Sequence, residues 1–174
     1  TNTWLSIGQS VYRAGLRKLL IINAHGGQPQ IMHIVARELR VRYEMAVVFA
    51  NTWSLGYPTG MLAEDEIHYG IHGGLSETSM MLHLRPDLVR MERAENFRSV
   101  LPTIEGEYKH LRIIGNVNLG WQAQDLHPLG VAGNAAGATA RVGKSLVDHA
   151  ASAFAVLIEE VSRYPLSNIK SRAT

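Results

Sequence analysis

The 174-residue chain contains no cysteine, so disulfide bonds and cysteine-ligated metal centres are both excluded. It has no apolar run near the ~20 residues that a membrane-spanning helix needs. The chain has no large excess of charge of either sign. Its 17 basic and 15 acidic side chains give a net charge of +2, which is too little for a nucleic-acid-binding surface. No basic segment followed by an apolar one opens the sequence. We therefore expect a cytoplasmic protein that binds neither membranes nor nucleic acids.

Hydrophobic residues make up 46% of the chain and charged residues 18%, which is typical of a folded globular protein. The length predicts a single domain over residues 1–174. Eight histidines are the one unusual feature of the composition. Because cysteine is absent, histidine and carboxylate side chains would have to hold any transition metal.

The first third of the chain has the pattern of an α/β protein. Residues 18–23 and 45–50 are short apolar runs typical of buried parallel strands, and residues 30–43 carry apolar side chains at helical spacing. A helical crossover between two strands requires that they run parallel, so we expect these strands to be neighbours in a mostly parallel sheet. Residues 1–17 are expected to form the end of a further helix.

The remainder of the chain is expected to hold a long loop at 51–73, a helix at 76–84, a strand at 112–118 and a long helix at 137–164. Loops as long as the first of these are often functional. Trp53 lies near its start, where it would either wall a substrate pocket or anchor the loop by packing.

His25 lies just past the carboxyl end of the first predicted strand, at the edge where open α/β sheets bind ligands. Gly26 and Gly27 come next, and without side chains they allow a close approach of the backbone to a ligand. The alternative interpretation is a tight strand-to-helix turn in which His25 caps the helix.

A second His-Gly-Gly sequence begins at His72, with His68 upstream and Glu77 downstream. Glu77 falls in the first turn of a predicted helix, where the helix dipole favours the carboxylate form that a metal requires. The alternative is that Glu77 only stabilises the helix and that the histidines lie on a loop without function. The recurrence of His-Gly-Gly at two element junctions favours a functional site.

Three segments together resemble the creatininase (creatinine amidohydrolase) family. Residues 20–28 (LIINAHGGQ) resemble its strand and Asn-Gly-His-Gly-Gly-Asn turn, and residues 72–82 (HGGLSETSMML) resemble its His-Ala-Gly or His-Gly-Gly…Glu-Thr-Ser signature. Residues 130–143 resemble its Gly-Val-x-Gly-Asp-Pro…Ala-Thr…Gly pattern. The three segments occur in the family's order, so the resemblance covers nearly the whole chain.

This resemblance implies an α/β sandwich around a mostly parallel sheet. It also implies a metal-dependent amidohydrolase that cleaves the C–N bond of a small cyclic amide or a formamide, with two divalent ions (Zn or Mn, with Fe an alternative) per complete site. His25 and Glu77 would be metal ligands and His72 the proton-transfer residue. Trp53, Gly26, Gly27 and His68 would contact the substrate.

The sequence also departs from the family pattern. The family's amino-terminal Glu-x-His-Gly-x-His-Leu-Pro…Asp motif, which supplies most of the metal ligands, has no counterpart in residues 1–17. The chain is therefore expected to be an amino-terminally incomplete domain. The alternative function is accordingly a non-catalytic, truncated domain that oligomerises or pairs with the missing segment. His68 stands where creatinine-specific enzymes have tryptophan, so creatinine itself is not the expected substrate.

These interpretations give three further expectations. His25, His72 and Glu77 should converge in one cleft at the carboxyl edge of the sheet. The chain should form a homo-oligomer, because an exposed sheet edge or apolar face favours association. Two or three donors are too few for a two-metal site, so this chain alone should bind divalent metal weakly and hydrolyse amides slowly or not at all.

Overall fold

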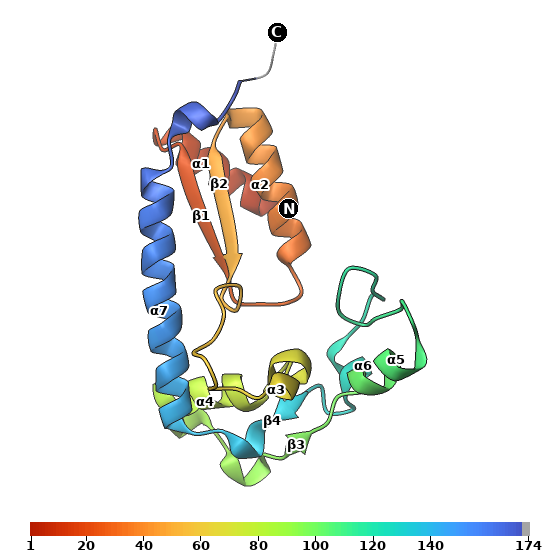
Figure 1. Cartoon of the computed structure of the whole chain (residues 1–174). Helices are drawn as coiled ribbons and strands as arrows, with labels where there is room; N and C mark the ends of the chain where they lie inside the picture. The colour runs from red at the N-terminus through yellow and green to blue at the C-terminus, as the bar shows by residue number, and fades with distance from the viewer. Residues whose placement is uncertain (172–174) are drawn as a thin grey trace. The chain divides into compact units, whose positions relative to one another are not determined.

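The chain folds into helices, short 3₁₀ turns and two pairs of strands, as the computed structural model shows for residues 1–171 (Figure 1). In chain order the elements are α1 (Asn2–Arg13), β1 (Lys18–Asn23), α2 (Pro29–Tyr43), β2 (Ala46–Asn51), α3 (Glu64–Tyr69), α4 (Leu75–Leu84), η1 (Pro86–Leu88), η2 (Met91–Arg93), β3 (Asn96–Phe97), α5 (Leu101–Glu107), α6 (Ala123–Leu126), β4 (Gly133–Asn134), η3 (Ala135–Gly137), α7 (Ala140–Arg163) and η4 (Leu166–Asn168). Residues 1–56, with the described residues from Ala150 onward, form one compact unit, unit 1, and residues 57–149 form unit 2.

Unit 1 contains the predicted strand–helix–strand arrangement. β1 and β2 pair in parallel, in a register that runs from Lys18 opposite Ala46 to Asn23 opposite Asn51. The prediction of two adjacent parallel strands joined by a helix is therefore confirmed. The register also brings two asparagines side by side at the carboxyl ends of the strands, which is the edge that carries His25.

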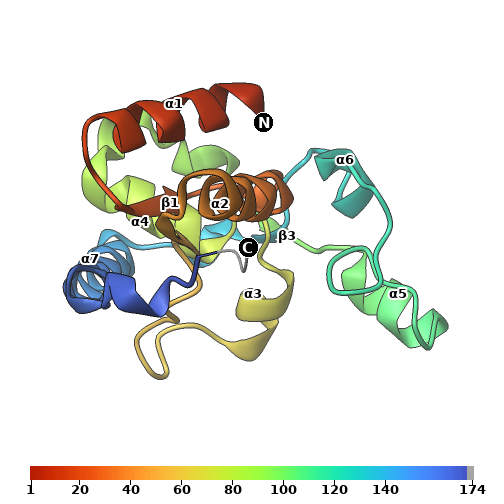
Figure 2. The same ribbon diagram turned by 90° about the horizontal axis from the view of Figure 1, so that it is seen from above.

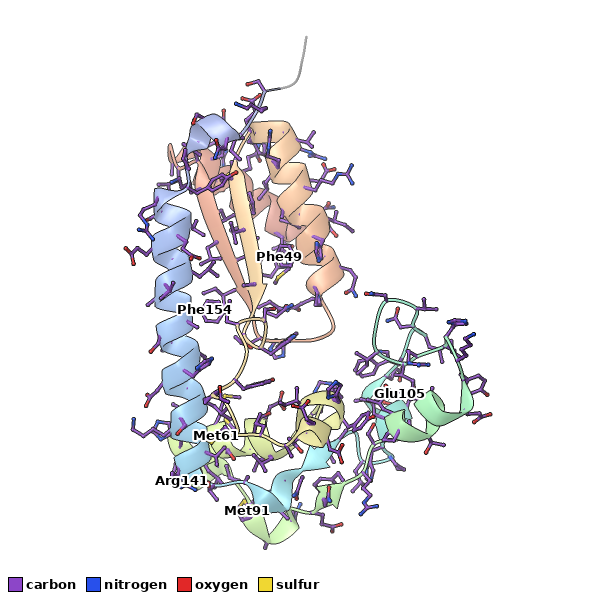
Figure 3. All side chains as sticks on the ribbon, in the orientation of Figure 1. Phe49, Met61, Met91, Glu105, Arg141 and Phe154 are labelled. Carbon is purple, nitrogen blue, oxygen red and sulfur yellow. The ribbon has the colours of Figure 1, made fainter. Side chains whose placement is uncertain are left out.

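Apolar packing holds α1 and α2 together beside this strand pair (Figure 2). Gly8 makes the close approach feasible, because a Cβ atom there would lie 2.3 Å from Leu39 Cδ1. Phe49 projects from β2 toward α2 (Figure 3), where the His33 ring meets it edge-on at a centroid distance of 4.2 Å. The buried core of the unit consists of Ile21, Met32, Val35, Leu39 and Met45.

The carboxyl-terminal part of α7 belongs to unit 1 and runs alongside β1 (Figure 1). Lys18 Nζ donates a hydrogen bond to the carbonyl of Ser162 and so ties the start of β1 to the end of α7. Phe154 is buried on the same part of the helix.

Unit 2 is built from short helices around a small apolar cluster of Leu101, Ile113, Leu126 and Ala132. β3 and β4 form an antiparallel pair. The first turn of α7 contacts α4 closely, since a Cβ atom on Gly143 would lie only 1.8 Å from the carbonyl oxygen of Ser79. Ser79 Oγ also accepts a hydrogen bond from the Thr139 N–H at 3.1 Å. These two contacts fix the helix that carries Glu77.

Two predictions of local structure are wrong. Residues 112–118 do not form a strand; the segment folds back on itself, so that Arg112 pairs with Asn118 as an isolated bridge. Gly115, at a φ of +136°, breaks the extended run there. Residues 51–73 are not one loop, because α3 lies within them. Glu64, Asp65 and Glu66 form its first turn, where the helix dipole favours negative side chains.

The prediction of an α/β fold with a parallel strand pair and covering helices is confirmed. The prediction of one domain over residues 1–174 stays a prediction. No helix within residues 1–171 combines the length and hydropathy needed to cross a membrane.

Candidate functional site

The His25 turn in unit 1 is organised by the buried side chain of Asn23. Its Nδ2 donates to the His25 carbonyl and to Asn51 Oδ1, both at 2.7 Å. Its Oδ1 accepts from the His25 N–H at 3.1 Å and from Gln28 Nε2 at 2.8 Å. A single amide therefore closes the turn, joins it to the neighbouring strand and fixes the start of α2.

His25 itself is exposed, as are Gly26 and Gly27. A Cβ atom built on either glycine would meet no described atom within 4 Å, so packing within unit 1 does not require glycine at these positions. Trp53, 39% exposed, also belongs to unit 1.

The His72 turn in unit 2 is held by backbone pairing. The His72 N–H donates to the Ala132 carbonyl at 3.2 Å, and the Ala132 N–H donates to the His72 carbonyl at 2.7 Å. The partly buried His72 ring lies 6.1 Å from the Trp121 ring, centroid to centroid. The imidazole thus projects from a fixed backbone beside an aromatic surface.

Glu77 lies in the first turn of α4, as predicted, and is exposed. Its Oε2 accepts a hydrogen bond from the Gly73 N–H at 2.8 Å. Thr78 Oγ1 donates to the Gly73 carbonyl at 3.0 Å, so both polar groups of the Gly73 backbone are bound to α4. The structure therefore brings His72 and Glu77 together on one braced turn.

Tyr57 adds a phenol to this part of unit 2. Burial raises the pKa of the Tyr57 hydroxyl above its ordinary value, and the negative charges of Glu77 and Glu66 raise that pKa further. The hydroxyl therefore loses its proton only at a higher pH than an exposed tyrosine does.

His68 is exposed on α3, where its Nδ1 lies 2.9 Å from the carbonyl oxygen of Glu64. It belongs to unit 2 with His72 and Glu77, whereas His25, Gly26, Gly27 and Trp53 belong to unit 1. The convergence of His25 with His72 and Glu77 stays a prediction.

Residues 1–171 contain no group of three or more His, Asp or Glu side chains that could hold a metal ion. One carboxylate oxygen of Glu77, Oε2, already accepts a hydrogen bond from the Gly73 N–H. The side chains that the structure brings together therefore do not fit a complete metal centre by themselves.

Sequence reasoning missed Glu66, Tyr57 and Trp121. Glu66 accepts hydrogen bonds from two backbone N–H groups of unit 2, those of Leu75 and Asn134. The acidic run at 64–66 was the available signal for a helix start, but no local pattern points to contacts so distant in sequence.

Comparison with known proteins shows a consistent set of relatives. The model of the creatininase family, described as creatinine amidohydrolase, matches residues 1–158. A creatinine amidohydrolase from Pseudomonas putida is 32% identical in an alignment 108 residues long, which covers 53% of this chain and 40% of that protein.

Solved structures give the same result. A Bacteroides fragilis protein named as a candidate creatinine amidohydrolase is 27% identical and superposes with a TM-score of 0.68, over 92% of this chain and 60% of that one. A point mutant of creatininase complexed with creatine is 22% identical, with a TM-score of 0.67 over 94% of this chain and 64% of that one. Two further creatininases, described as a Zn–Zn type and a Mn form, are 24% and 23% identical. The chain thus spans less than two thirds of the length of these relatives.

Proposed function

Because the chain belongs to the creatininase family, we propose that it acts in the hydrolysis of a C–N bond in a small cyclic amide or a formamide. The observation that carries this proposal is the placement of His72. Two backbone hydrogen bonds fix the residue, its side chain stays partly exposed, and its position opens the family's His-Gly-Gly…Glu-Thr-Ser signature.

In the proposed reaction the oxygen of a water molecule adds to the amide carbonyl carbon while the His72 imidazole takes a proton from that water, and the C–N bond of the resulting tetrahedral species then breaks. The nitrogen leaves as an amine only when it receives a proton, and the His72 imidazolium would donate that proton. Histidine suits this step because an imidazole can accept a proton and then donate it. Glu77, which holds the Gly73 N–H, keeps the turn in place during the transfer.

For substrate binding we propose the open surface at Gly26 and Gly27, together with Trp53 and His68. The support is the empty space around the two glycines, which packing within unit 1 leaves unused. Histidine at position 68, rather than the tryptophan of creatinine-specific enzymes, supports a substrate other than creatinine.

For a divalent ion, Zn or Mn, we propose His25 and Glu77 as ligands. No three-donor group exists within residues 1–171, so further ligands would be required, and no step of the reaction above depends on the ion. Titration calorimetry with Zn²⁺ and with Mn²⁺ tests the assignment. Binding should weaken at least about tenfold in His25→Ala and in Glu77→Ala, and should be unchanged in His110→Ala, where the altered histidine is exposed in unit 2. Equal binding by all four proteins would contradict it.

The activity test uses a panel of formamides, cyclic amides and creatinine, with the hydrolysis products measured by proton NMR. His72→Gln should lower kcat by roughly 100-fold or more, the usual contribution of a positioned general acid. His110→Gln is the matched control and should retain the wild-type rate. Hydrolysis that survives in His72→Gln would exclude the proposed proton transfer. A wild-type chain that hydrolyses no member of the panel would favour the non-catalytic alternative.

A further inference from the structure

The carboxylate of Glu66 joins two backbone segments of unit 2 that are far apart in sequence. Its Oε1 accepts the Leu75 N–H at 2.6 Å, and its Oε2 accepts the Asn134 N–H at 2.9 Å. Leu75 is the first residue of α4, and its N–H is one of the groups that a helix cannot satisfy internally. Each carboxylate oxygen is therefore committed to a different segment.

Three glycines leave the space that this carboxylate occupies. A Cβ atom on Gly70, Gly74 or Gly133 would lie 2.4, 2.3 or 2.9 Å from Glu66 Oε1, respectively, well inside van der Waals contact. Gly133 has a φ of +134°, and a Cβ there would also lie 2.7 Å from the Gly74 Cα. The backbones of the two segments thus approach each other closely, and the Glu66 carboxylate sits where they meet.

The same two segments carry the backbone pair that holds His72. His72 pairs with Ala132, and the N–H groups bound by Glu66 follow within three residues on each side, at Leu75 and Asn134. The two hydrogen bonds of the bridge hold the His72 backbone, and both segments continue beyond it toward Leu75 and Asn134. A carboxylate that binds both segments just beyond the bridge restricts how far they can separate or slide.

We propose that Glu66 is the positioning residue for His72: by binding the Leu75 and Asn134 N–H groups it holds the His72–Ala132 pair in register and fixes the direction of the imidazole. This inference rests on the proposed role of His72 in proton transfer. Glu66 does not touch the reacting atoms in this scheme. Its carboxylate is needed because both oxygens must accept, and an amide side chain offers only one acceptor oxygen.

The first test compares Glu66→Gln with Asp65→Asn, a carboxylate-to-amide change at the preceding position of the same helix. The ¹³Cε1–¹H signal of His72, assigned with His72→Gln, is recorded for each folded protein. In Glu66→Gln the His72 signal should shift or broaden while those of the other seven histidines stay in place. Asp65→Asn should leave all eight unchanged. If the His72 signal is unmoved in Glu66→Gln, the proposal is overturned.

Leu75→Pro removes one of the two hydrogen bonds without altering Glu66. Proline is favoured at the first position of a helix, and the extended backbone of Gly74 is compatible with a following proline, so this variant is expected to fold. It should move the His72 signal in the same direction as Glu66→Gln. A folded Leu75→Pro protein with an unchanged His72 signal would also overturn the proposal, even if the Glu66→Gln protein does not fold.

Kinetics on an active substrate supply a second readout. Glu66→Gln should lower kcat roughly tenfold to 100-fold, as for a misplaced catalytic group, with little change in KM. A change confined to KM would contradict a positioning role. If the wild-type chain proves inactive, the proposed function fails, whereas the NMR comparison still decides whether Glu66 fixes His72.

Discussion

Replacement of Gly143 by alanine should test how closely α7 must approach the helix that carries Glu77. The added Cβ atom would lie 1.8 Å from the Ser79 carbonyl oxygen and 2.3 Å from the Ser79 carbonyl carbon. These are backbone atoms of α4, so no flexible side chain can move aside. The two helices would have to separate by more than about 1 Å to reach normal contact.

The size of the effect follows from two opposing terms. Overpacking of a close contact costs about 1–3 kcal/mol, and a rigid backbone partner places this contact at the upper end or beyond. Alanine in place of glycine inside a helix stabilises the folded state by about 1 kcal/mol through its higher helix propensity. We therefore expect Gly143→Ala to lower the free energy of unfolding by about 2 kcal/mol or more, a large share of a typical stability of about 5–15 kcal/mol.

Urea unfolding followed by far-ultraviolet circular dichroism measures this difference. Gly106→Ala is the matched control, because Gly106 lies in α5 and a Cβ there would meet no described atom within 4 Å. That variant should be about 0.5–1 kcal/mol more stable than the wild type, through helix propensity alone. If Gly143→Ala were as stable as Gly106→Ala, the close contact between α4 and α7 would not exist in solution.

Three further predictions concern other parts of the chain. Asn23→Ala should lower the free energy of unfolding by about 2–4 kcal/mol in urea titrations. The reason is that four hydrogen bonds at the end of β1 are lost and their partners are left partly unsatisfied. A loss of unfolding free energy below about 0.5 kcal/mol would contradict the role of the Asn23 amide. The Tyr57 hydroxyl has a raised pKa because of burial and the charges of Glu77 and Glu66, so its contribution to stability should be complete below about pH 10 and disappear as the pH rises through the folded-state pKa. Tyr57→Phe should therefore lose less stability than the wild type between pH 9 and pH 11.5, and equal losses would be evidence against this assignment. The chain should form a homo-oligomer by light scattering, and Ile7→Glu, placed on the exposed apolar surface of α1, should shift it toward the monomer if that surface is the interface.

The fold of unit 1 was largely predictable because its signals are local. The apolar run at 18–23 became β1 with the same bounds, and the helix expected at 30–43 begins one residue earlier, at Pro29. Proline is favoured at the start of a helix, which explains the difference. The parallel pairing followed from the order strand–helix–strand, so it required no knowledge of distant contacts.

The site in unit 2 was predictable only in part, because its supports come from distant residues. The motif identified His72 and Glu77. It did not identify Glu66, because Glu66 binds Asn134, a residue 68 positions further along the chain. The predicted strand at 112–118 failed for a related reason. Its apolar residues serve a local core around Ile113 rather than a sheet, and Gly115 permits the chain to turn back.

The two His-Gly-Gly turns, alike in sequence, use their glycines for different physical reasons. In the second turn, Gly73 has a φ of +63° and Gly74 leaves room for the Glu66 carboxylate, so the fold itself requires both glycines. In the first turn, Gly26 and Gly27 have neither a positive φ nor a close neighbour among the described residues, and Asn23 closes the turn through its own side chain. Packing within unit 1 therefore does not account for these two glycines. The proposed ligand site would give them a reason, because a bare backbone beside the exposed imidazole of His25 would admit a ligand to a distance that a side chain would block.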